Sequence, residues 1–317
     1  MLFSLSHGAF RIEPLNVIKI LANQVYSINP SWSTEDELIL LQVRLPRIIL
    51  VVLVGANLAV SGTILQAIFK NPLVSPFILG ISSGASLGAS IVIVFFNFYS
   101  FYILQLSAFT FSIIAVLIVL LITRICNSQN TTILVLAGVV TSSFFQAIVS
   151  LLQYFSESDK LQSIVYWNFG SFTNASWNSV LQVVPFTIIG IMILFLNSWR
   201  INVLSLGDEE STALGLNTQR YRFGIIVIVS LLTSTATAVT GPIGWVGLII
   251  PHIVRMTVGS NKYFVILGSI GLGSAFMLLV DFFARTTFNF ELPVGIVTSI
   301  IGVPFFIFIL YRTNNQI

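Results

Sequence analysis

Residues 71–123 read NPLVSPFILGISSGASLGASIVIVFFNFYSFYILQLSAFTFSIIAVLIVLLIT, and this stretch decides the fold class. It holds 53 residues without one Asp, Glu, Lys or Arg. A helix that crosses a membrane needs about 20 mostly apolar residues, so the stretch is long enough for two spans. Residues 97–100 (NFYS) are the natural break between them. A transmembrane β-barrel has alternating segments of about 10 residues instead. The continuous apolar run therefore predicts membrane-spanning helices.

The rest of the chain has the same character. Of its 317 residues, 56% are hydrophobic and only 8% are charged, whereas a soluble domain carries roughly 25% charged residues. So few charges cannot cover a water-facing surface, and the apolar excess must face lipid. We therefore predict an all-α polytopic membrane protein that forms one transmembrane domain over residues 1–317. Its nine predicted spans are 48–69, 76–96, 102–123, 132–155, 180–198, 223–240, 243–258, 263–284 and 292–311.

One segment between these spans, and one that leads into the short seventh span and breaks it with Gly and Pro, need a different structure. Residues 161–179 are too polar to span, and Trp167 and Trp177 suit a membrane interface, so a short surface helix and loop are expected there. Residues 241–247 read GPIGWVG and cannot form an ordinary helix. Such a turn at membrane depth is tolerated only where protein buries it. We expect a re-entrant turn, with a role along a substrate path as the alternative.

The distribution of Lys and Arg sets the orientation. Without the N-terminal segment, eight of these residues fall on one side of the predicted spans and four on the other. Cytoplasmic loops carry the excess of positive charge. The eight are Lys70, Arg124, Arg200, Arg220, Arg222, Arg255, Lys262 and Arg312, and the four are Arg44, Arg47, Lys160 and Arg285. Loop 199–222 is therefore placed in the cytoplasm and segment 161–179 outside.

The sequence does not contain the residue patterns of an enzyme. No Gly is followed by Lys, so the G-x-x-x-x-G-K-[ST] phosphate loop does not occur. The two histidines are far apart, and Cys126 is the one cysteine, which implies no internal disulfide and no metal cluster. We predict no catalytic residue, no metal ligand and no cofactor bound by this chain. Basic residues at span ends are explained by anchoring, without nucleic acid.

The cytoplasmic loop 199–222 is the first candidate for a functional surface. Acidic residues in a first helical turn interact favourably with the helix dipole, so the run 208–210 after Gly207 looks like a helix start. Gly215 would end this helix, and Asn217 could begin another. Two short helices would make a rigid knob that docks a cytoplasmic partner. A solvated connecting loop is the alternative.

Charges on the opposite side are the second candidate. Arg44 and Arg47 precede a span on the face where arginine is disfavoured. They are either interface anchors or a docking point for acidic groups of an external protein. Asp281 and Arg285 are four residues apart, which favours an ion pair within one helix. Arg285 could still join Arg44 and Arg47 on one external surface.

At this point a family resemblance becomes specific. It is carried by seven motifs, in order, from about residue 40 to 311. They are RLPR (44–47), SGTILQAIFKNPLVSPFILGISSGASLGA (61–89), LAGVV (136–140), LSLGDEESTALGL (204–216), GPIGWVGLIIPHIVR (241–255), DFFAR (281–285) and ELPVG (291–295). In these motifs the chain resembles the FecCD-like permease subunits of type II ABC importers, which carry ferric siderophores, haem and cobalamin.

The resemblance implies the partners and the transport function. It implies a homodimer in the bacterial cytoplasmic (inner) membrane, surrounded by lipid, with the substrate path along its two-fold axis. Two cytoplasmic ATPase subunits would bind ATP and Mg and hydrolyse ATP, so this chain is not itself the enzyme. A periplasmic or lipid-anchored binding protein would deliver a metal chelate. Ferric siderophore is the first expectation, with cobalamin, haem and molybdate as alternatives.

The resemblance also implies roles for individual residues. By motif position, Arg44, Arg47 and Arg285 would meet the binding protein, and Asn71, Leu73, Asn130 and Thr131 would form the cytoplasmic gate. The residues that would fit the ATPase are Gly207, Asp208, Glu209, Glu210, Ala213, Leu214, Gly215 and Leu216. The span from 132 and the helix near 162–170 would line the path.

The N-terminus departs from the family pattern. The family has ten spans, but residues 1–10 resemble only the end of its first span, and residues 11–43 carry too many charges to supply it. We expect that the natural chain starts upstream, or that its start was misassigned or lost.

A secondary transporter driven by an ion gradient is the rival function. It should show ionisable groups inside the membrane for coupling. Asp281 is the one acidic residue within the predicted spans, and it lies near an external end.

Overall fold

The computed structural model describes residues 2–8, 10, 12–26, 30–96, 100–126, 131–288 and 290–314. The regular elements of these residues are helices, as expected for the all-α class. The longer ones are α4 (Leu45–Ile68), α5 (Ile81–Phe95), α6 (Phe101–Ile125), α7 (Thr131–Tyr154), α9 (Trp177–Leu196), α12 (Thr218–Thr240), α13 (Val246–Val258), α14 (Lys262–Thr286) and α15 (Val294–Asn314).

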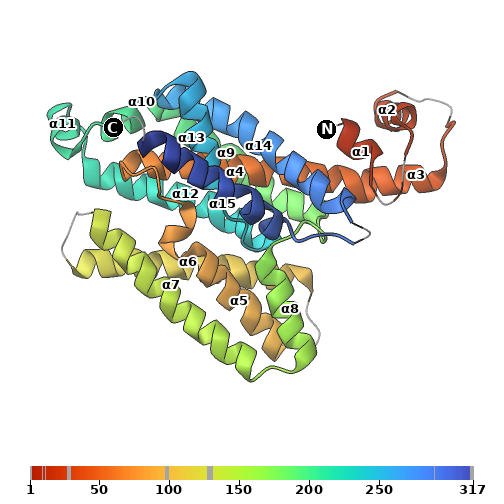
Figure 1. Ribbon diagram of the computed structural model, residues 1–317, viewed down its shortest axis with the longest axis horizontal. Helices are drawn as coiled ribbons and strands as arrows, with labels where there is room; N and C mark the ends of the chain where they lie inside the picture. The colour runs from red at the N-terminus through yellow and green to blue at the C-terminus, as the bar shows by residue number, and fades with distance from the viewer. Residues whose placement is uncertain are drawn as a thin grey trace.

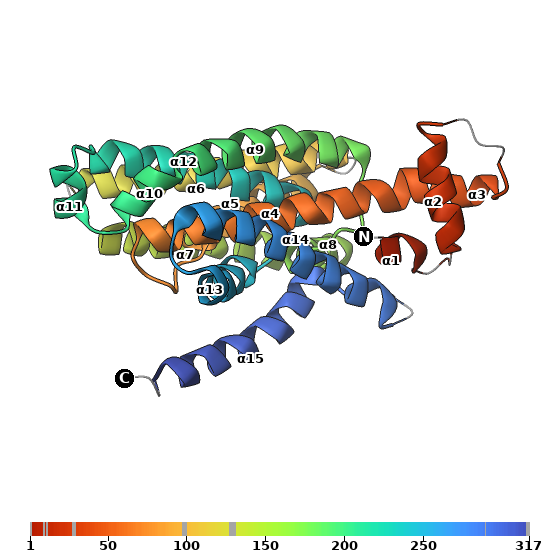
Figure 2. The ribbon, with the colours of Figure 1, turned by 90° about the horizontal axis from the view of Figure 1, so that it is seen from above.

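Short helices occupy the ends and connections. They are α1 (Leu2–Ser6), α2 (Pro14–Asn23), α3 (Thr34–Leu38), a π-helical segment (Ile39–Arg44), a 3-10 turn (Pro76–Leu79), α8 (Ser158–Phe169), α10 (Ser198–Leu204) and α11 (Asp208–Ala213). Figure 1 shows α5, α6, α7 and α8 grouped on one side of the bundle. The N-terminal helices α1 to α3 lie at one end of the molecule and α11 at the other, and α15 diverges from the bundle in Figure 2.

Helix α4 is the central helix of the bundle. It is buried along most of its length and packs against α9, α12, α13 and α14. Small residues allow this contact: a Cβ on Gly55 would lie 2.5 Å from the Gly273 carbonyl oxygen, and one on Gly62 would lie 1.9 Å from that of Gly247. Glycines of α4 therefore permit the close approach of α13 and α14.

The count of nine spans is not confirmed. Among the described residues, six helical segments are long and apolar enough to cross a membrane, and three predicted spans correspond to shorter apolar helices at 81–95, 246–258 and 294–307. At 1.5 Å per residue, α5 and α13 are only about 20 Å long, less than the roughly 30 Å of hydrocarbon. The chain enters each of them through non-helical backbone: Gly80 before α5 and Trp245 before α13 have φ of 77° and 70°.

The predicted turn at 241–247 is present and buried by protein. Residues 241–244 are not helical and connect α12 to α13. Gly241 has φ of 74°, and a Cβ there would lie 2.3 Å from the Trp167 carbonyl oxygen at the end of α8. The Gly170 carbonyl in turn accepts a hydrogen bond from the Gly295 amide at the start of α15. Close backbone packing thus replaces lipid around this segment.

Candidate functional site

The three predicted docking arginines come together at the N-terminal end of α4. Arg47 donates to Asp281 from Nε (3.0 Å) and pairs with Glu291 from Nη1 (2.8 Å). Arg285 donates from Nε to the other oxygen of Asp281 (3.0 Å), which is the intrahelical pair expected from their spacing. Asp281 is fully buried. One carboxylate therefore joins α4 and α14 through two guanidinium groups.

Arg44 is held by backbone of the N-terminal segment. It is 6% exposed, and its Nη1 donates to the Leu5 carbonyl at 2.5 Å while Nη2 donates to that of Phe10. Arg285 also donates from Nη2 to Ser4 Oγ at 2.7 Å. The arginines thus share one end of the molecule, where they bind carboxylates and the N-terminal segment. Their docking role stays a prediction.

A cavity of about 540 Å³ opens beside this arginine cluster, and Arg44, Arg47, Arg285 and Glu291 line it. Burial would raise the pKa of Glu291, but the charge and hydrogen bond of Arg47 and a hydrogen bond from Thr173 lower it overall, below its ordinary 4.5. The ion pair contributes stability at neutral pH that is lost as the pH falls through the lowered pKa. The sequence analysis did not identify Glu291, although its place in the ELPVG motif was a signal.

At the opposite end of α4 the predicted knob forms. Helix α11 starts after Gly207 with three acidic residues, and Gly215, with φ of 81°, follows its end. Asn217 caps α12 by accepting from the Arg220 amide at 3.0 Å. The two predicted helix starts and the predicted stop are therefore confirmed.

The knob is tied to the bundle at several points. Buried Ser211 donates to the Val203 carbonyl on α10 at 2.9 Å, and Arg222 on α12 pairs with Asp208 at 2.6 Å. Of the predicted coupling residues, Gly207 and Leu216 are buried. The exposed ones are Asp208, Glu209, Glu210, Ala213, Leu214 and Gly215. The knob thus presents acidic and apolar groups on a rigid support.

Lys70 links this knob to the predicted gate loop, a contact that the sequence analysis did not identify. It follows the end of α4 with φ of 50°, a conformation that costs energy in a residue with a side chain. Its Nζ donates to the Leu206 carbonyl, at 2.5 Å, just before the knob. The next residue, Asn71, accepts the Leu73 amide on its Oδ1 at 2.9 Å and so shapes the NPL turn.

The structure describes one of the two predicted gate segments fully and the other only in part. Asn71 and Leu73 are both exposed at this end of the molecule. Asn130 lies outside the described residues, and Thr131 is described only as the first residue of α7. The proximity of the two predicted gate segments therefore stays a prediction.

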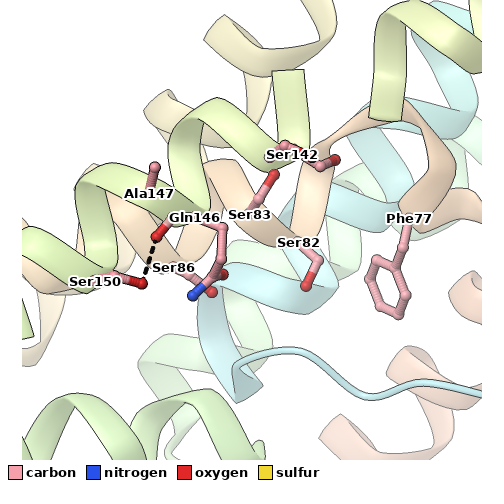
Figure 3. Close-up of a pocket in the computed structure, with 9 residues that line it drawn as sticks. Phe77, Ser82, Ser83, Ser86, Ser142, Gln146, Ala147 and Ser150 are labelled. Carbon is pink, nitrogen blue, oxygen red and sulfur yellow. Dashed lines mark hydrogen bonds between the residues drawn. The ribbon is translucent and has the colours of Figure 1, made fainter. Parts of the chain in front are cut away.

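A hydroxyl-rich groove of about 630 Å³ lies between α5 and α7 (Figure 3). Seven of its nine lining residues are neutral and polar, and the other two are Phe77 and Ala147. The polar ones are Ser82, Ser83, Ser86, Ser142, Ser143, Gln146 and Ser150. On α7, residues 143, 146, 147 and 150 follow the spacing of one helical face. A polar face with seven neutral groups can exchange hydrogen bonds with a hydrated solute.

Helix α8 contacts the same groove. Ser86 donates to Asn168 Oδ1 at 2.5 Å, and Asn168 donates back within α8 to the Ile164 carbonyl at 3.0 Å. This contact fixes the end of α8 against α5. The surface helix predicted in segment 161–179 thus begins earlier, at Ser158, and reaches the groove.

In the part of the chain that the structure describes, six helical segments are long and apolar enough to cross a membrane, and an open polar groove lies between α5 and α7. Residues 1–312 match the model of the FecCD transport family. The chain belongs to this family, whose members are permeases of ABC transporters, and it is a multi-pass inner-membrane protein.

Individual relatives agree with this assignment. The chain is 43% identical over 278 residues to an iron chelatin transport system permease protein of Helicobacter pylori, covering 88% of this chain and 84% of that one. It is 42% identical to the molybdate import system permease protein MolB of Haemophilus influenzae, covering 87% and 82%. A solved inward-facing conformation of a metal-chelate type ABC transporter matches with a TM-score of 0.84 and 37% identity, covering 98% of both chains.

Proposed function

We propose that this chain is the membrane subunit of an importer that moves a metal chelate from an external binding protein to the cytoplasm, driven by ATP hydrolysis in a partner subunit. The observation that supports the proposal is the placement of the arginine cluster and the knob, the two proposed interaction surfaces, at opposite ends of α4. The arginine cluster lies at its start and the knob, held by Lys70, follows its end. A polar groove runs between the neighbouring helices.

The groove supports the transport step. A solute that crosses a membrane needs a polar wall that is shielded from lipid, and one wall of such a path is what α5 and α7 form. Exposed apolar residues lie on α7 beside the polar face: Leu136, Val140, Phe144 and Leu151. A second copy of the chain that packs there would close the groove. The proposed path therefore follows the axis of a homodimer.

The substrate is proposed as a ferric siderophore, with cobalamin, haem and molybdate as the other candidates. Relatives of similar identity carry names with different cargo, an iron chelate for one and molybdate for another. None of the described residues that line the groove is charged, so these residues do not select a substrate by a fixed charge. This supports selection by the binding protein rather than by the path.

Uptake into proteoliposomes tests the proposal. The chain is reconstituted with its candidate ATPase and binding protein, and uptake of a radiolabelled ferric siderophore is followed with and without internal ATP. We expect ATP-dependent uptake that stops when the ATPase is inactivated. Uptake driven by a proton or sodium gradient without ATP would contradict the proposal and establish the secondary transporter instead. Parallel assays with cobalamin, haem and molybdate identify the cargo.

Lys70 is expected to couple the knob to the gate. In the variant Lys70→Met the hydrogen bond to the Leu206 carbonyl is lost while the aliphatic length is kept. We expect the ATPase to co-purify as with the wild type, but uptake per ATP hydrolysed should fall. Arg124→Met serves as the control, because it also replaces a positively charged residue on the predicted cytoplasmic side by methionine. Unchanged uptake per ATP in Lys70→Met would contradict the coupling role.

A further inference from the structure

A second, separate cleft lies on the lipid-facing side of α6 and α9, away from the groove. Its outer part, about 650 Å³, is lined by polar residues that include Asn174, Ser176 and Asn178. Its inner part, about 270 Å³, is lined mainly by apolar residues of α6, α9 and α12. The two parts share Tyr102, Gln105, Leu181 and Gln182. The cleft is therefore continuous and amphipathic.

The polar part lies at the external end of the bundle. Trp177, the first residue of α9, donates from its indole nitrogen to the Leu41 carbonyl at 3.0 Å, beside the arginine end of α4. Gln182 follows five residues later, about 8 Å deeper at 1.5 Å per residue. The headgroup layer is of a similar thickness. Gln182 thus sits near the level where glycerol esters meet the hydrocarbon.

The apolar part is a slot for a hydrocarbon chain. Phe109 and Phe186 line it, with ring centroids 5.9 Å apart. Pro185 in the adjacent turn of α9 cannot donate a backbone hydrogen bond and perturbs the helix there. Leu106, 52% exposed, lines the entrance.

The two glutamines differ in what they bind. Gln105 is 4% exposed and donates to Ser179 Oγ at 3.1 Å. Gln182 is half-buried in the cleft wall, and no side-chain hydrogen bond joins it to another described residue. A carboxamide within a span is costly unless it finds a partner. Its amide group can donate to an ester carbonyl.

We propose that this cleft binds one phospholipid of the outer leaflet. Gln182 and the asparagines hold its glycerol-ester region, and one acyl chain fills the slot between Phe109, Phe186 and α12. The described residues that line both parts include no charged side chain, so the site recognises the ester region and chain rather than the headgroup charge.

Native mass spectrometry of the full chain tests the proposal. The protein is purified in detergent, supplied with either phosphatidylethanolamine or phosphatidylglycerol, and the retained lipids are counted. We expect one retained lipid with both headgroups in the wild type. Leu106→Trp, which fills the entrance, and Gln182→Leu, which removes the carboxamide, should each lose it. Retention by both variants would overturn the proposal, and so would binding of phosphatidylglycerol alone.

Leu117→Trp is the matched control. Leu117 lies on the same face of α6, three turns deeper, and is 57% exposed, but it does not line the cleft. This variant should keep the lipid. Thermal melting of each variant shows that it is folded, so that loss of lipid is not loss of structure. If Leu117→Trp also loses the lipid, the proposal of a specific lipid site is overturned.

Discussion

Replacing Glu209 and Glu210 together by arginine is expected to release the ATPase subunit from this chain. Both carboxylates are exposed on α11, on a knob that is tied to the bundle by Ser211 and Arg222. A basic partner surface would then meet like charge. A loss of about 3 kcal/mol corresponds to roughly a hundredfold weaker binding. A pull-down from native membranes, with identification of co-purified proteins, measures the effect.

The control for this variant reverses the same number of charges at the other end of the molecule. Glu13 and Glu35 are exposed near the arginine cluster. Glu13→Arg/Glu35→Arg should leave the ATPase bound. If the ATPase stays with Glu209→Arg/Glu210→Arg, the knob is not the coupling surface. If instead the control variant loses it, the two faces of the protein are reversed.

Replacing Asp281 by alanine is expected to destabilise the protein more than any other single loss of an ion pair described above. Asp281 is fully buried and pairs with both Arg47 and Arg285. Removing one partner of a buried pair costs about 3–5 kcal/mol, because it leaves an uncompensated buried charge. Arg47 keeps Glu291, so Arg285 is the group left without a carboxylate. Thermal melting in detergent measures the loss.

Asp208→Ala is the matched comparison for Asp281→Ala. It also removes one aspartate from an arginine pair, but Asp208 is half exposed, and exposed pairs contribute about 0–1 kcal/mol. Asp281→Asn should melt nearly as low as Asp281→Ala, because the amide keeps the shape without the charge. Equal melting temperatures for Asp281→Ala and Asp208→Ala would contradict the central role of the buried pair.

Local patterns in the sequence predicted the local features of the structure. The acidic run after Gly207, the stop at Gly215 and the cap at Asn217 are set by interactions within a few residues, and all three form. The same holds for the pair of Asp281 with Arg285, one helical turn apart. Interactions between residues that are close in sequence are sufficient to predict the structure at these positions.

Features that depend on distant residues could not be predicted in this way. Arg47 and Glu291 are 244 residues apart in the sequence, and no local pattern indicates that they meet. The length of α5 was also missed, because an uncharged stretch does not show where the backbone leaves the helix. The positive φ of Lys70 and its bond to Leu206 likewise depend on the packed structure.

The ion pairs of the arginine cluster have a consequence for how fast a binding protein would associate and dissociate. Asp281 already pairs with both Arg47 and Arg285, and Glu291 pairs with Arg47. An incoming carboxylate must therefore compete with carboxylates in place, and the net gain is the difference between two similar ion pairs. If the arginine cluster is the docking surface, such competition keeps the residence time of the binding protein short. A binding protein must dissociate after each delivery to bind new substrate. A docking surface whose arginines are already paired with carboxylates of its own chain would favour this dissociation.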